Sequence, residues 1–338
     1  MRRMLTVAVG MVLSVSALRA QLQLAAPESM AGSDAWGKLV AANNLDVRGN
    51  TPFHLGMTFQ LYDLHGKPSG AGSFETWWSA PGSQRTVVHL AGLDENGSSP
   101  SGADAELLRD SYLVRQLIAS AVRLVPPEPR LGSPIVTKTV NVGKAVLTCA
   151  APSSGPSESM NAQPTTVCAE PQTENVVLLQ GLGGKELILR ARTGKFHDTY
   201  VALDLRITYL GVDAITGKVT TLQSFDPATS DVKMPAESQL KAEPMSGGVI
   251  AGHRIQFKEP SYPPMAKMEH ASGYVLLNVI IGEDGSVERL TPIASTHEMF
   301  TDEAMKAVKQ WKYSPYLLNG KPTKVDSTVT VNFALFRE

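Results

Sequence analysis

The most constraining feature of the sequence is an alternation of apolar and polar residues near the C-terminus. Successive side chains of a β-strand point to opposite faces, so a period of two predicts a half-buried strand over 324–335. The apolar set is expected to face a core, and Ser327 is the single polar residue within it. Its members are Val325, Val329, Val331, Phe333 and Leu335. The polar set is expected to face away, and its members are Lys324, Asp326, Thr328, Thr330 and Asn332.

The residues before this strand predict a small α+β module. A helix at 263–271 begins with proline, which suits the first turn of a helix. Two strands at 273–281 and 287–294 are joined by a tight turn at Asp284-Gly285. Ser295 and Glu298 have the spacing of a capping box ahead of a second helix. A further hairpin is expected at 319–320.

Five motifs of this module occur in an order typical of one family. They are Ser261-Tyr262-Pro263-Pro264-Met265-Ala266, Gly273-Tyr274-Val275, Glu283-Asp284-Gly285-Ser286-Val287, Ala307-Val308-Lys309-Gln310-Trp311-Lys312-Tyr313-Ser314-Pro315 and Asn319-Gly320-Lys321-Pro322. They resemble the C-terminal domain of TonB energy transducers, and the resemblance covers 249–338. It implies a periplasmic domain that pairs with the TonB-box strand of outer-membrane transporters.

The resemblance also implies where a partner binds. The family places the Tyr262-Pro263 motif beside the partner-binding surface. The last strand is long and carries no proline, so we expect it to be an exposed sheet edge to which a partner strand is added. The expected binding residues are Tyr262, Pro263, Lys324, Asp326, Thr328, Thr330 and Asn332. The long Pro-rich rod of a transducer is replaced here by a globular module, so coupling to transport stays open.

Residues 21–223 predict an antiparallel sheet around one long helix, followed by a linker at 224–248. Period-two alternation begins at 53–62, a turn is expected at 63–72, and partner strands at 74–78 and 85–90. A short helix is expected from 34 to 45 and the long one at 103–124, before two prolines. Further strand-like runs lie at 134–147, 176–179, 187–192, 200–209 and 219–222.

This middle module more weakly resembles the LolA-like and RseB-like periplasmic lipoprotein carriers. The residues that carry the resemblance are 53–62, 72–78 and Cys149 with Cys168. It implies an apolar concave side that receives a lipid or acyl chain. Trp77 and Trp78 are neighbours on a strand, so their rings face opposite sides. Either core packing or a place in a ligand cavity would explain them.

The N-terminus predicts export. Arg2 and Arg3 precede a mostly apolar stretch at 5–18, and Ala17 and Ala20 provide small residues at a cleavage site. The stretch is shorter than the roughly 20 residues needed to span a bilayer, so residues 1–20 are expected to be a signal peptide. A signal anchor that stays uncleaved beside Arg19 is the alternative. The predicted compartment is the periplasm.

The chain has two cysteines, Cys149 and Cys168. In an exported chain such a pair favours a disulfide, which would staple the loop-like segment from Ala150 onward. Metal ligation is disfavoured because two distant cysteines are too few ligands and no histidine lies near either.

The sequence predicts binding rather than catalysis. The net charge is −1 and basic runs are absent, which argues against nucleic acid as a partner. The Ser230 and Lys233 pair lacks the companion motifs of acyl-transfer enzymes. We therefore expect no enzyme activity, no cofactor and no metal. The leading expectation is a TonB-type binding protein for an outer-membrane transporter or another envelope protein, and the alternative is a carrier or sensor of a hydrophobic ligand.

Overall fold

The structure is a computed structural model, and it describes residues 29–31, 33–100, 102–126, 135–142, 145–152, 165–233, 243–244, 254–318 and 320–335. The expected signal peptide, 1–20, lies outside the described residues. None of the helices in these ranges is both long enough and apolar enough to cross a membrane.

The chain divides into two compact units. The first contains the described residues of Met1–Ala103, Asp110–Gly155 and Pro164–Ser238. The second contains those of Asp104–Arg109 and Gln239–Glu338. Each unit has its own main sheet.

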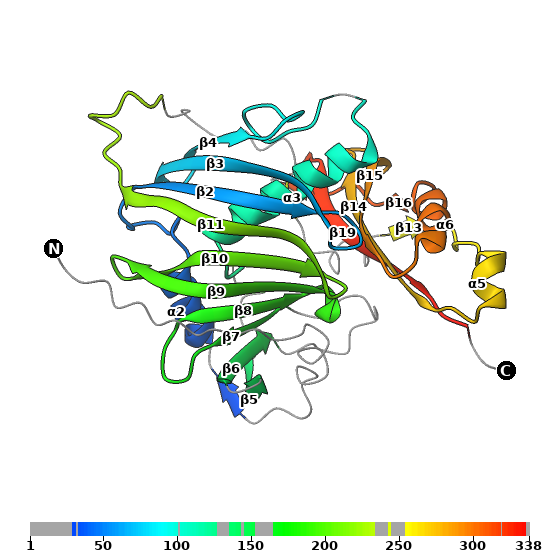
Figure 1. The fold of residues 1–338 in the computed structure, drawn as a ribbon, viewed down its shortest axis with the longest axis horizontal. Coiled ribbons are helices and arrows are strands. Elements are labelled where there is room, and N and C mark those ends of the chain that lie inside the picture. Colours follow the sequence, from blue (N-terminus) through cyan, green and yellow to red (C-terminus); the bar gives the residue numbers. More distant parts are fainter. Residues whose placement is uncertain are drawn as a thin grey trace. The chain divides into compact units, whose positions relative to one another are not determined.

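The first unit is built on an eleven-stranded antiparallel sheet (Figure 1). Its strand order is β1-β5-β6-β7-β8-β9-β10-β11-β2-β3-β4. The strands are β1 (Ser29–Ala31), β2 (Phe53–Tyr62), β3 (Pro68–Ala80), β4 (Ser83–His89), β5 (Ile135–Val142), β6 (Ala145–Pro152), β7 (Thr166–Ala169), β8 (Val176–Gly181), β9 (Glu186–Phe196), β10 (Thr199–Tyr209) and β11 (Val212–Ser224). A short 3-10 helix, η1 (Leu182–Gly184), joins β8 to β9. The predicted α+β class, with a large antiparallel sheet and few helices, is confirmed.

The long predicted helix is α3 (Ala105–Val122), which packs on the sheet through its apolar face. Leu113, Val114 and Leu117 are fully buried. Leu117 lies over Gly217 of β11, where an added Cβ would come within 3.0 Å of the leucine side chain. The glycine therefore lets the helix approach the sheet closely.

A second helix, α2 (Ser33–Asn43), is held to the same face of the sheet by Arg190 of β9. The guanidinium donates to Oδ1 of Asn43 at 2.9 Å and to its carbonyl oxygen at 3.0 Å. Carbonyl groups at a helix C-terminus carry partial negative charge, which favours a cation there. Burial lowers the pKa of Arg190 to about 9.

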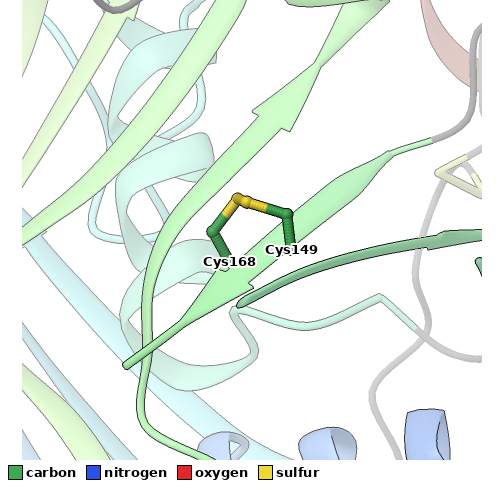
Figure 2. The surroundings of a disulfide bond; sticks show 2 residues. All are labelled: Cys149 and Cys168. Atoms are coloured by element: carbon green, nitrogen blue, oxygen red, sulfur yellow. A yellow bond between two sulfur atoms is a disulfide. The ribbon is translucent and has the colours of Figure 1, made fainter. Parts of the chain in front are cut away.

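The predicted disulfide between Cys149 and Cys168 is present (Figure 2). The two cysteines face each other on the neighbouring strands β6 and β7, and both are completely buried. The bridge is not at the surface, and the expected loop does not begin at Ala150, because Ala150 and the two residues after it continue β6. The rest of the expected loop, 153–157, lies outside the described residues. The disulfide therefore links β6 to β7 within the buried part of the sheet.

Several predicted elements of the first unit differ from the observed ones. The run at 134–147 is two strands, β5 and β6, which pair with each other. The expected turn at 63–72 is shorter, because β3 already begins at Pro68. Strand β7 was not predicted, since four residues are too few to show a period.

The second unit contains a four-stranded sheet in the order β12-β19-β14-β15. Its strands are β12 (Glu243–Pro244), β14 (Gly273–Ile281), β15 (Val287–Ser295) and β19 (Val325–Phe333). Two helices, α5 (Pro264–Met268) and α6 (Glu298–Val308), belong to this unit. Two small antiparallel pairs complete it: β13 (Arg254–Gln256) with β16 (Lys312–Tyr313), and β17 (Leu317–Leu318) with β18 (Lys321–Pro322).

The core of this unit follows the predicted alternation. Strand β19 buries every second residue, including Ser327, whereas the residues between them are half-buried or exposed. The buried set packs with one face of β14 and with the apolar stripe of α6. The central members are Val275, Leu277, Val279, Phe300, Ala304, Val308, Val329, Val331 and Phe333.

The predicted capping box of α6 is wrong. The N-cap residue is His297, and its side chain makes no capping hydrogen bond. Strand β15 runs through Ser295, so this serine lies two residues too early, and its hydroxyl donates to the His297 carbonyl at 2.6 Å. Helix α5 is also shorter than predicted, and the chain leaves it with His270 in the left-handed region at φ 52°.

The predicted turn at Asp284-Gly285 joins β14 to β15 and also contacts β16. Gly285 has φ +81°, and its carbonyl oxygen accepts from the Tyr313 N–H at 2.9 Å. A Cβ on Gly285 would lie 1.9 Å from the Tyr313 carbonyl oxygen. Glycine is thus required there by both conformation and space.

Oxidation of Cys149 to Cys168 is the first testable prediction. Mass spectrometry of native, non-reduced protein should show one bridge, and two free thiols would contradict it. The C149S/C168S variant should lose about 2–4 kcal/mol of stability in the first unit, because the unfolded chain is no longer constrained. Hydrogen exchange of β14 should be unchanged in that variant.

The Gly285 turn gives a second prediction with a matched control. Gly285→Ala should destabilise the second unit by at least about 2–3 kcal/mol, since it combines a left-handed alanine with a backbone clash. Gly320 has a similar φ of +79° but no atom within 4 Å of an added Cβ. Gly320→Ala should therefore cost only about 1 kcal/mol. Hydrogen exchange of β14 measures both effects, and equal losses would show that the clash at Tyr313 does not matter.

Candidate partner-binding site

Strand β19 carries the candidate site, and β14 fixes its position. The two strands pair over the whole of β19, from Gly273 opposite Phe333 to Ile281 opposite Val325. A one-residue slip would turn the buried set out of the core, so the core fixes this register.

The expectation that β19 is the outermost strand is wrong. On the side away from β14, β12 runs parallel to it, with Glu243 opposite Val325 and Pro244 opposite Asp326. The sequence does not reveal β12, because a strand of two residues within a stretch that lacks any period resembles a linker.

The structure brings most of the predicted binding residues together. Asp326, Thr328 and Thr330 are half-buried on the polar face of β19, and Asn332 is exposed on the same face. Lys324 directly precedes the strand. Their assignment as partner contacts remains a prediction.

A buried amide on the same face of the sheet was not predicted from the sequence. Asn278 of β14 is 2% exposed, and its Nδ2 donates to Oδ1 of Asp326 at 2.5 Å and to the Ser327 carbonyl at 2.9 Å. It therefore orients the Asp326 carboxylate and satisfies its own amide in the interior. The available signal was a single polar residue within the otherwise apolar run at 275–281.

Lys324 is held by an ion pair at the start of β19. Its Nζ lies 2.8 Å from Oε2 of Glu288 on β15. The hydrogen bond to Glu288 raises the pKa of Lys324. Both side chains are more than a third exposed, so the pair contributes little stability. Its effect is to position the lysine.

Tyr262 and Pro263 lie near the other end of β19. The Tyr262 ring meets Phe300 and Phe333 edge-on, at centroid distances of 5.8 and 5.9 Å. Its hydroxyl donates to the Ala271 carbonyl, and Pro263 is buried at the start of α5. Tyr262 thus packs against the core, and a further role in selecting a partner remains a prediction.

The tryptophan pair lies in the first unit, and its two rings do not line one cavity. Trp78 is 3% exposed and stacks on Phe53 at 5.7 Å between centroids. Trp77 is half-buried on the opposite face, where it stacks on His54 at 4.6 Å. The predicted opposite orientation is confirmed, and a ligand role for either ring stays a prediction.

Comparison with known proteins places the resemblance in the second unit. Residues 258–335 match the family model described as Gram-negative bacterial TonB protein C-terminal. The protein TonB of Vibrio cholerae serotype O1 is 28% identical over 78 residues, which are 23% of this chain and 32% of that relative. The match therefore spans about a third of the relative's length.

Solved structures of two kinds are also similar to the chain. The solution NMR structure of the Pseudomonas aeruginosa TonB C-terminal domain is 24% identical, with 25% of this chain and 87% of that chain covered and a TM-score of 0.23. An outer membrane lipoprotein-sorting protein domain from Vibrio parahaemolyticus is 9% identical, with 60% and 94% covered and a TM-score of 0.35. The expected resemblance of the C-terminal region to TonB is confirmed, over 258–335.

Proposed function

We propose that this protein is a periplasmic, non-catalytic binding protein of TonB type that takes up an extended segment of an outer-membrane transporter along β19. The observation that carries the proposal is the parallel pairing of β12 with the outer side of β19. This pairing shows a strand of the chain itself added to the side of β19 where a partner strand would pair.

The physical basis is main-chain pairing. A strand laid along a sheet satisfies its N–H and C=O groups with those of the neighbouring strand, which supplies most of the affinity. The side chains that β19 turns away from its core are Asp326, Thr328, Thr330 and Asn332, a polar set of mixed character. Such a surface suits an extended polar peptide.

The periplasmic location and the following division into domains are part of the same proposal. We assign residues 1–20 to a signal peptide, 21–223 to the sheet-and-helix module, 224–248 to a linker and 249–338 to the binding domain, and the linker contributes β12 (243–244) to the sheet of that domain. Partner binding is favoured over lipid carriage because the pairing of β12 with β19 is itself a case of strand addition.

Methylation of backbone nitrogens in the peptide tests the proposal without changing the protein. TonB-box peptides from the bacterium that makes the protein would be titrated calorimetrically against the full chain. In strand pairing, alternate N–H groups of the peptide point toward β19 and the others point away. N-methylation of one alternate set should weaken binding at least about tenfold, and methylation of the other set should change it by less than about threefold.

A side-chain control completes this prediction. The T328A/T330A variant keeps both backbone N–H groups, so its affinity should change by less than about threefold. If none of the peptides binds at high micromolar concentration, or if both methylated sets behave alike, pairing with β19 is not the binding mode.

A further inference from the structure

We infer that the chain keeps its own strand, β12, on the partner edge of β19, and that this strand competes with the incoming partner. This inference rests on the proposed function and adds a means of regulation to the same site. Its basis is the register of β12 against Val325 and Asp326.

Competition follows from the geometry of a sheet. Each backbone N–H or C=O group on one side of a strand pairs with a single neighbouring strand. Val325 and Asp326 are the first two residues of β19, so β12 occupies the beginning of the edge. A partner strand in register with the whole of β19 has to displace Glu243 and Pro244.

The pairing of β12 with β19 is weak enough for a partner strand to displace it. It spans two residues, and one of them is a proline, which has no N–H to donate. Such a strand would pair poorly as a separate peptide. It belongs to the same chain as β19, however, and two segments of one chain meet at a higher effective concentration than two separate molecules do.

The expected size of the effect follows from the fraction of molecules whose edge is open. Apparent affinity falls in proportion to that fraction. If β12 covers the edge in about nine molecules of ten, removing it should strengthen partner binding about tenfold.

The test uses the full-length protein and two matched double variants. E243G/P244G replaces both residues of β12 with glycine, which disfavours a strand. P235G/E237G removes the same two residue types from the same polar stretch outside β12. Each protein is examined by hydrogen exchange over 325–333 without ligand, and by calorimetry with the TonB-box peptides.

We expect faster exchange over 325–333 and roughly three- to tenfold tighter peptide binding in E243G/P244G, with P235G/E237G like the natural protein. Unchanged exchange in E243G/P244G would show that β12 does not cover the edge. Faster exchange with unchanged peptide affinity would show that the cover does not regulate binding. Either result overturns the inference and leaves the proposed function standing, whereas failure of every protein to bind peptide overturns the proposed function.

Discussion

The pairing of β14 with β19 is the interaction on which the second unit depends. It joins two strands along their whole length and sets the register that sends Val329, Val331 and Phe333 into the core. Because the period of a strand is two, the same register places Asp326, Thr328, Thr330 and Asn332 together on the other face. The candidate site is thus a direct consequence of how the core is packed.

The same pairing explains the buried amide. Asn278 lies opposite Thr328 on the neighbouring strand, within reach of Asp326 and the Ser327 carbonyl. A polar group in the interior is tolerated where its hydrogen bonds are made, and these two bonds connect β14 to the beginning of β19. That beginning is also where β12 pairs, so one short region combines an oriented carboxylate with a strand from the linker.

The sequence predicted those features of the fold that depend on residues close to one another in the chain. The alternation of β19, the extent of β14 and the glycine turn at Gly285 follow from residues close in sequence, and the structure confirms them. Long-range contacts were out of reach. No periodic pattern in the sequence indicates the hydrogen bond from Arg190 to the end of α2 or the pairing of β12 with β19. The capping box was predicted wrongly because β15 extends through Ser295.

Site-specific photo-cross-linking in cells tests the central claim most directly. A photoreactive amino acid would replace Asn332, which is exposed on β19, and in a separate strain Lys309, which is exposed at the end of α6. If β19 is the partner edge, the probe at 332 should capture an outer-membrane transporter, identified by mass spectrometry, and the probe at 309 should not. Capture from 309 but not from 332 would contradict the account.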